Sequence, residues 1–344
     1  MLGRILSKLQ KKRVLLHIGL PKCGSSSLQA YMADRAKAHH DMGVCYPTAH
    51  RLRSGYRNHL PLAQMAPDEL PRALKQIEAE AQGCHTIVLS CEHWTNALHI
   101  CNLASLCTEL SRIMPDRTLH VVAYFRSPFD FADSCYAQFI RAGLMGVNRP
   151  EFYADGAPSI ERFLHRFEML RGYPLWSIKA WCEEIRTKTQ GARLSLRSME
   201  PGDLPAENFI SDFCALAGVA PPATMPKQNL RLSNRKLAEL EYAQTLIDND
   251  SHMAARDRMI AHDFGRHHPN DTARIAGLNI GADTAQAIER TLKAEKSKIT
   301  QLFATRTTRL CAVPVRDWHR RDLLTADDKA QIARYVGSRQ RGAA

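Results

Sequence analysis

Three short and almost wholly apolar runs, separated by segments of helical periodicity, constrain the fold most. The runs are Val14–Ile18, Thr86–Ser90 and His120–Phe125. Runs of this length without polar alternation are typical of strands that are covered on both faces. Their alternation with helical segments predicts βαβ units and a mainly parallel sheet. We therefore expect an α/β protein in three layers, with helices on both faces of a central sheet.

The segments between these runs carry apolar residues at helical spacing, which predicts helices at about 25–38, 67–81 and 102–113. Val44–Tyr46 and Arg193–Arg197 are weaker strand candidates. Two further amphipathic faces predict helices, one containing Trp181 and Cys182 and the other running from Phe209 to a stop at Gly218.

The C-terminal part of the sequence reads as helices joined by polar connections. Thr325–Asp328 forms a capping box, which predicts the start of a last helix that ends at Gly337. The expected parts are a basic leader at 1–13, an α/β core at 14–230, and a helical C-terminal extension packed on that core at 231–344.

The composition excludes several classes of protein. Of 344 residues, 44% are hydrophobic and 24% charged, which is ordinary for a folded soluble chain and unlike a disordered or collagen-like one. No apolar run approaches the roughly 20 residues that a membrane-spanning helix needs. The net charge of +12 favours an anionic partner: nucleic acid, an acidic membrane surface, or a phosphorylated or sulfated small molecule.

Cysteine and histidine spacing argues against disulfides and metals. The ten cysteines include no CxxC pair, so we expect free thiols in a reducing cytoplasm. His39-His40 and His267-His268 have no companion at a metal-ligand spacing, so no metal site is expected. Residues 1–13 have apolar residues at helical spacing among basic ones, and this leader is either a frayed soluble segment or a peripheral contact with an anionic membrane.

The turn after the first predicted strand, Gly19–Ser27, is the strongest local signal. A glycine-bounded turn between a buried strand and a helix directs backbone N–H groups and the positive helix end at one point. Lys22 adds a point charge, and three consecutive serines add hydroxyl groups. These features suit a phosphate-like dianion, although Ser25 occupies the place of the Walker A lysine. The alternative is a capped helix with an incidental lysine.

Two more polar groups follow predicted strands. Arg126 comes directly after His120–Phe125, and Ser134 lies about two turns into the next helix, so a guanidinium and a hydroxyl can form a second phosphate clamp. Arg126 could instead pair with a nearby aspartate. Glu92 and His93 follow Thr86–Ser90 and are candidates for a general base, or else surface residues that open a loop.

The positions of these polar residues in the predicted sheet favour a binding site over the structural alternatives. In an open α/β sheet, ligands bind outside the carboxyl ends of the strands. Lys22, Glu92 and Arg126 each fall within a few residues of such an end on three different strands. We expect two separated anion sites, one at Lys22 and one at Arg126 and Ser134, with a base between them.

At these residues the sequence resembles the sulfotransferases that use 3′-phosphoadenosine 5′-phosphosulfate. The loop Pro21–Ser26 is similar to their 5′-phosphosulfate loop, and Arg126-x-Pro128 with Ser134-x-Tyr136 is similar to their 3′-phosphate motif. The resemblance covers residues 13–145 well and the second half weakly. It implies a P-loop-like fold, no metal, and transfer of a sulfuryl group to a hydroxyl or amine acceptor.

The resemblance also implies a role for each matching residue. Lys22 would contact the bridging oxygen of the phosphosulfate, Glu92 would be the base with His93 in reserve, and the late segment 227–233 is a candidate for closing over the 3′-phosphate. The candidate catalytic residues are Lys22, Glu92 and His93. The candidate residues that bind the co-substrate are Pro21, Lys22, Cys23, Gly24, Ser25, Ser26, Ser27, Arg126 and Ser134. Cys23, Ser25 and Ser26 replace threonines of the family pattern.

The basic charge and the glutamate-type base favour a saccharide or polysaccharide acceptor. One alternative is a P-loop phosphotransferase or nucleotide kinase, which Ser25 in the Walker lysine position disfavours. Another is a nucleic-acid-binding protein, for which the sequence has no recognisable motif and only scattered basic residues. We therefore expect no nucleic-acid partner.

Overall fold

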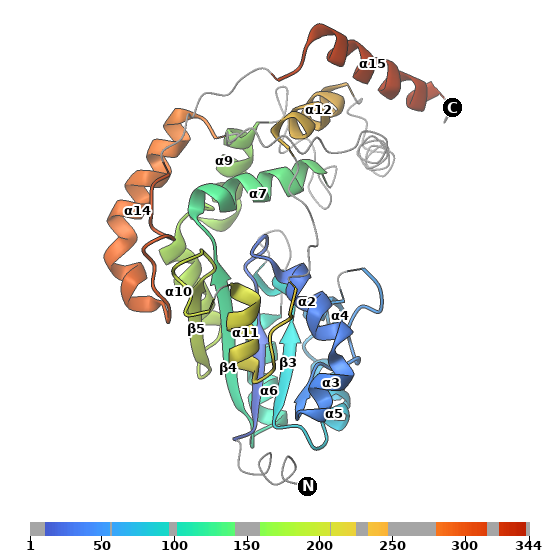
Figure 1. The fold of residues 1–344 in the computed structure, drawn as a ribbon, viewed down its shortest axis with the longest axis vertical. Helices are drawn as coiled ribbons and strands as arrows, with labels where there is room; N and C mark the ends of the chain where they lie inside the picture. The colour runs from blue at the N-terminus through green and yellow to red at the C-terminus, as the bar shows by residue number, and fades with distance from the viewer. Residues whose placement is uncertain are drawn as a thin grey trace. The chain divides into compact units, whose positions relative to one another are not determined.

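The computed structural model describes residues 11–55, 57–95, 102–141, 159–206, 208–224, 233–246, 280–314 and 323–341. Five strands form one sheet, and every pair of neighbours is parallel (Figure 1). Their order across the sheet is β2-β3-β1-β4-β5. The strands are β1 (Arg13–His17), β2 (Val44–Cys45), β3 (Thr86–Ser90), β4 (Thr118–Phe125) and β5 (Arg193–Ser198). All five strands coincide with predicted runs to within two residues.

The central strand β1 sets the register of the sheet. Arg13 lies opposite Thr86 of β3 on one side and Thr118 of β4 on the other, so all three strands begin at the same edge. Val14, Leu15 and Leu16 are at most 1% exposed, as expected for a strand with helices on both faces. The carboxyl ends of β1 and β3 also lie level, because His17 is opposite Ser90.

Helices cover both faces of the sheet, which confirms the predicted α/β architecture (Figure 1). Helix α2 (Ser25–Asp34) and helix α11 (Phe209–Ala217) cover one face. Helices α5 (Leu70–Glu80), α6 (Leu103–Ile113) and α10 (Ile178–Lys188) lie on the opposite face, where α6 contacts both α5 and α10. Right-handed crossovers that run in opposite directions across a sheet place their helices on opposite faces. Here the connection from β1 to β2 runs in one direction, and the connections from β2 to β3, β3 to β4 and β4 to β5 run in the other.

The remaining elements are short connections and the helices of the C-terminal half. They are α3 (Ala36–Asp41), α4 (Leu60–Ala63), the 3₁₀ helix η1 (Glu92–Thr95), α7 (Pro128–Arg141), α9 (Ile160–Arg171), α12 (Asn234–Thr245), α14 (Ala282–Leu302) and α15 (Ala326–Arg341).

Two helix boundaries differ from the prediction. The helix expected at 25–38 is broken at Arg35, whose backbone leaves the helical region. The break brings the rings of Tyr31 and His39 to 5.4 Å edge to face, whereas eight residues of continuous helix would separate them by about 12 Å along the axis. The last helix starts at the predicted capping box but passes Gly337 and ends at Arg341. A mid-helix glycine costs only about 1 kcal/mol, which the rest of the helix can offset.

The chain divides into two compact units, each built from three stretches. The first unit contains the described residues within Met1–Ser127, Ile178–Asn229 and Glu295–Ala312, and includes the sheet. The second contains those within Pro128–Ser177, Leu230–Ala294 and Val313–Ala344. The units therefore interleave along the sequence, and the predicted folding domains at 14–230 and 231–344 stay a prediction.

The second unit is helical, and polar contacts, two of them buried, join its helices. The hydroxyl of Tyr136 on α7 donates to Glu241 Oε1 on α12 at 2.5 Å, and Gln244 Nε2 donates to the carbonyl of Ile140 at 2.7 Å. Arg235 on α12 pairs with Asp328 on α15 at 2.7 Å. Within the described ranges, none of the helices has the length and apolar character needed to cross a bilayer.

Candidate functional site

The loop between β1 and α2 turns through backbone conformations that favour glycine. Gly19 and Gly24 have φ angles of 100° and 79°, and Lys22 adopts a left-handed φ of 62°. A Cβ atom on Gly19 would lie 3.1 Å from the Cβ of Glu92, so the loop backbone passes directly against η1. The predicted loop and the predicted base are thus in contact.

Gly24 lies beneath an aromatic ring. A Cβ atom built on Gly24 would be 2.4 Å from Cζ of Phe209, the first residue of α11. The Phe209 ring in turn contacts Tyr124 of β4, with 5.9 Å between the ring centroids. The close approach of backbone and ring explains why this position needs glycine.

The start of α2 offers donors that the described residues do not use. The helix has no side-chain cap, and its first N–H groups to find backbone acceptors are those of Ser27 and Leu28, both bonded to the Gly24 carbonyl. In the part of the chain that the structure describes, the N–H groups of Ser25 and Ser26 have no acceptor. The Ser25 hydroxyl is buried and also lacks a partner there. A helix start of this kind is suited to bind an anion.

The other loop residues differ in exposure. Cys23 is fully buried, whereas Pro21, Lys22, Ser26 and Ser27 are half-buried. A buried thiol at position 23 cannot replace the exposed hydroxyl that a threonine would offer a ligand. The side chains available at the loop surface are therefore those of the lysine and the two later serines.

Glu92 and His93 lie half-buried on η1, not in an irregular loop. The hydroxyl of Thr95, at the end of this turn, donates to the carbonyl of Ile18 at 2.9 Å and ties η1 to the end of β1. Gln29 Nε2 on α2 donates to Glu92 Oε2 at 2.7 Å. The carboxylate is thus held from the helix that follows the loop.

Arg126 directly follows β4, and the loop is paired to the end of that strand. The Tyr124 N–H donates to the Gly19 carbonyl at 2.7 Å, and the Leu20 N–H donates to the Tyr124 carbonyl at 3.0 Å. The structure therefore brings together, at one edge of the sheet and within one unit, the loop, Glu92 and Arg126. The N–H of Ser127 donates to Glu200 Oε1 at 2.7 Å, so a carboxylate that follows β5 lies beside the residue after Arg126.

Ser134 belongs to the second unit. It is buried on α7, at the end of the second turn of that helix. Its pairing with Arg126 stays a prediction. The segment 227–232, proposed as part of a basic closure, lies outside the described residues, as do residues 1–10 of the leader.

Sequence reasoning missed a buried cluster that leads from the core to this edge. We call His17, Gln29, Ser90 and Glu92 the glutamate cluster. His17 Nδ1 lies 2.8 Å from Ser90 Oγ, and Gln29 Nε2 donates to that same Oγ at 3.2 Å. His17 Nε2 and Gln29 Oε1 are buried without a partner among the described residues. His17 and Ser90 near the ends of two apolar runs, and a glutamine one turn after Ser25, were the available signals.

Burial keeps His17 neutral, since desolvation lowers its pKa to about 3. His59, which contacts the backbone of Ser90, has a pKa lowered to about 3, again chiefly by burial. The Ser90 N–H donates to His59 Nδ1 at 3.2 Å. Uncharged imidazoles therefore surround the strand end that carries the candidate base.

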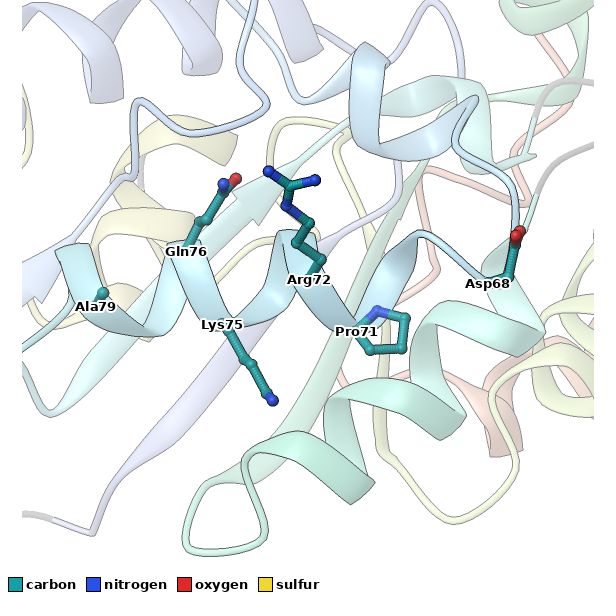
Figure 2. Close-up of a pocket in the computed structure, with 6 residues that line it drawn as sticks. All are labelled: Asp68, Pro71, Arg72, Lys75, Gln76 and Ala79. Atoms are coloured by element: carbon teal, nitrogen blue, oxygen red, sulfur yellow. The ribbon is translucent and has the colours of Figure 1, made fainter.

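A shallow groove lies elsewhere, on the exposed side of α5 (Figure 2). Its volume is about 540 Å³, and it is lined by Asp68, Pro71, Arg72, Lys75, Gln76 and Ala79. All six come from α5 and the turn before it, and none is a predicted site residue. A surface formed by one helix offers no convergent polar groups, so we do not connect it with chemistry.

Among the described residues, no group of three or more histidine, cysteine, aspartate or glutamate side chains is placed to hold a metal ion. Comparison of the chain with models of protein families, with curated proteins and with solved structures found no match.

Proposed function

We propose that this chain transfers a sulfuryl group from 3′-phosphoadenosine 5′-phosphosulfate to a hydroxyl or amine acceptor. The observation that carries the proposal is the β1–α2 loop, which presents unused N–H groups of Ser25 and Ser26 while touching Glu92 and pairing with the end of β4. An anion site, a carboxylate and a guanidinium at one sheet edge are the parts this reaction needs.

The loop would bind the 5′-phosphosulfate end of the donor. The backbone N–H groups and hydroxyls at Ser25 and Ser26 suit the 5′-phosphate, because a helix start carries a partial positive charge. Lys22 would offset the charge that grows on the leaving oxygen. Arg126, with Ser134 as its predicted companion, would bind the 3′-phosphate through a charge-assisted contact.

The transfer step needs no oxidant or reductant. The acceptor oxygen or nitrogen forms a bond to sulfur, the bond from sulfur to the bridging oxygen breaks, and its electron pair leaves with adenosine 3′,5′-bisphosphate. The acceptor's proton passes to a base, for which Glu92 is the first candidate and His93 the second. The net charge of +12 favours an acceptor that carries negative charge, and we propose a saccharide or polysaccharide.

Ligand-dependent thermal stability tests the nucleotide. Adenosine 3′,5′-bisphosphate at a hundredfold excess over its Kd should stabilise the folded protein by about 2.7 kcal/mol, whereas ATP with Mg²⁺ should not. Stabilisation by ATP with Mg²⁺ alone would instead favour a phosphotransferase. If neither nucleotide changes the melting temperature, the sulfotransferase proposal is wrong.

Lys22→Ala tests the chemistry. We expect it to lower transfer by about 10²–10³, because the developing charge on the leaving oxygen loses its counter-charge. The melting temperature should stay close to that of the parent, since the side chain is half-buried in a loop. Lys37→Ala, which removes an exposed lysine on α3, is the matched control. Near-normal turnover by Lys22→Ala would contradict the assigned role.

A further inference from the structure

Both N–H bonds of the Gln29 side-chain amide are used in hydrogen bonds. It donates to Glu92 Oε2 at 2.7 Å and to Ser90 Oγ at 3.2 Å, which accounts for both of its hydrogens. Gln29 is fully buried on α2. The amide cannot be reversed, because its oxygen would then face the Glu92 carboxylate.

The two oxygens of Glu92 consequently differ. Oε2 accepts from Gln29, whereas Oε1 has no hydrogen-bond partner among the described residues. The Gly19 backbone against the Cβ of Glu92 limits how far that side chain can shift. A carboxylate fixed through one oxygen presents the other in a defined direction.

We infer that Gln29 is a positioning residue, which holds Glu92 Oε2 and leaves Oε1 as the oxygen that takes the acceptor's proton. This inference rests on the proposed function and selects Glu92 over His93 as the base. As the acceptor binds sulfur, its proton moves to Oε1, and the S–O bond to the bisphosphate breaks. Gln29 itself touches no substrate and acts through the orientation and charge of Glu92.

The rest of the glutamate cluster supports this role. Ser90 Oγ bonds both Gln29 Nε2 and His17 Nδ1, so the hydroxyl helps to fix the amide that holds Glu92. His17 is neutral near pH 7, because burial lowers its pKa to about 3, and it therefore supplies no competing positive charge. The titratable or charged groups on the elements around Glu92 include His17 on β1, Lys22 in the loop, Tyr46 after β2, His59 before α4, Cys91 and His93 at η1, and Arg126 after β4.

The test follows the carboxyl carbon of Glu92 by NMR in protein labelled with ¹³C at glutamate Cδ, with the signal assigned by its loss in Glu92→Gln. In Gln29→Met, which keeps the length and removes the amide, the chemical shift of the Glu92 signal at pH 7 should change, since the hydrogen bond to Oε2 is lost. Gln64→Met, at an exposed position after α4, is the matched control and should leave the Glu92 signal unchanged.

Activity and binding separate this inference from the proposed function. If the proposed function holds, Gln29→Met should lower kcat about tenfold, with KM for the donor and affinity for adenosine 3′,5′-bisphosphate unchanged. An unchanged Glu92 signal in folded Gln29→Met overturns the inference, whether or not the bisphosphate binds. A shifted Glu92 signal without bisphosphate binding supports the Gln29–Glu92 coupling and refutes the sulfotransferase proposal. Should Gln29→Met not fold, Gln29→Asn, whose amide is one methylene short of Glu92, provides the same comparison.

Discussion

Two buried polar clusters of the first unit differ in how completely their atoms are paired. In the arginine cluster, which consists of Tyr124, Arg197 and Asp212, the Arg197 Nε and Nη2 atoms donate to the two Asp212 oxygens at 2.6 and 2.5 Å. The Tyr124 hydroxyl donates to Asp212 Oδ2 at 2.6 Å. No buried atom of these three side chains lacks a partner among the described residues.

The glutamate cluster is left incomplete. His17 Nε2 and Gln29 Oε1 are buried without partners in the described part of the chain, and Glu92 Oε1 has no bond there. An unpaired buried polar atom costs on the order of 1–3 kcal/mol, so such a cluster is a poor way to stabilise a fold. The comparison shows that the arginine cluster ties β4, β5 and α11 together, whereas the glutamate cluster leaves polar atoms unpaired, as the proposed function requires.

The largest expected effect is on the arginine cluster. Asp212→Ala should lower the free energy of unfolding by about 3–5 kcal/mol, because it leaves the buried Arg197 guanidinium without its counter-charge. Urea denaturation measures the change. Asp116→Ala breaks an exposed pair with Lys12 and should cost at most about 1 kcal/mol. Equal losses of unfolding free energy in both variants would mean that the buried ion pair stabilises the fold no more than the exposed one.

A second experiment concerns the contact between Gly24, which precedes α2, and Phe209 on α11. Gly24→Ala should destabilise the fold by about 2–4 kcal/mol, since it combines the cost of a left-handed alanine with a clash against the Phe209 ring. Gly83→Ala has a similar φ of 84° and nothing within 4 Å of the added atom, so it should cost only about 1–2 kcal/mol. Chemical denaturation of both variants isolates the clash. A loss for Gly24→Ala no larger than that for Gly83→Ala would show that the ring moves aside freely.

The smallest expected effect is a pH dependence from the glutamate cluster. The pKa of His17 is lowered to about 3 by burial, so its contribution to stability is present above the unfolded value of 6.5 and is lost as the pH falls toward 3. Between pH 6.5 and 5 this amounts to about 1.5 kcal/mol. His17→Asn keeps an acceptor near Ser90. Between pH 6.5 and 5, its free energy of unfolding, measured by urea denaturation, should fall by about 1.5 kcal/mol less than that of the parent.

His59 and His120, whose pKa values burial lowers to about 3 and about 4, continue to contribute in that variant. His40→Asn, at an exposed position of α3, is the matched control. A pH dependence identical in His17→Asn and the parent would remove His17 from the explanation.

The strands and the turn chemistry were predictable because their signals are local. Apolar runs of five or six residues marked β1, β3 and β4, and each strand matched its run to within two residues. Parallel pairing then placed Lys22, Glu92 and Arg126 near one edge, since the carboxyl ends of parallel strands lie together. The capping box at Thr325 and Asp328 formed as predicted, with each residue bonding the other's backbone N–H.

Local signals failed where a distant contact decided the outcome. Periodicity alone continued the helix through Arg35, but the meeting of the Tyr31 and His39 rings accompanies a turn there. His17 and Ser90 were assigned to apolar strands, and nothing in their neighbourhood indicated that Gln29 would join them.

The amino-acid sequence by itself determined the α/β class, the strands, and the presence of polar residues at the carboxyl ends of three of them, because hydrophobic periodicity and turn residues act over a few positions. Only the tertiary structure decided that Gln29 holds one oxygen of Glu92, 63 residues away, and that the Phe209 ring covers Gly24. Both contacts join residues that are far apart in the sequence. They depend on how helices pack over the ends of the strands, which no short stretch of sequence encodes.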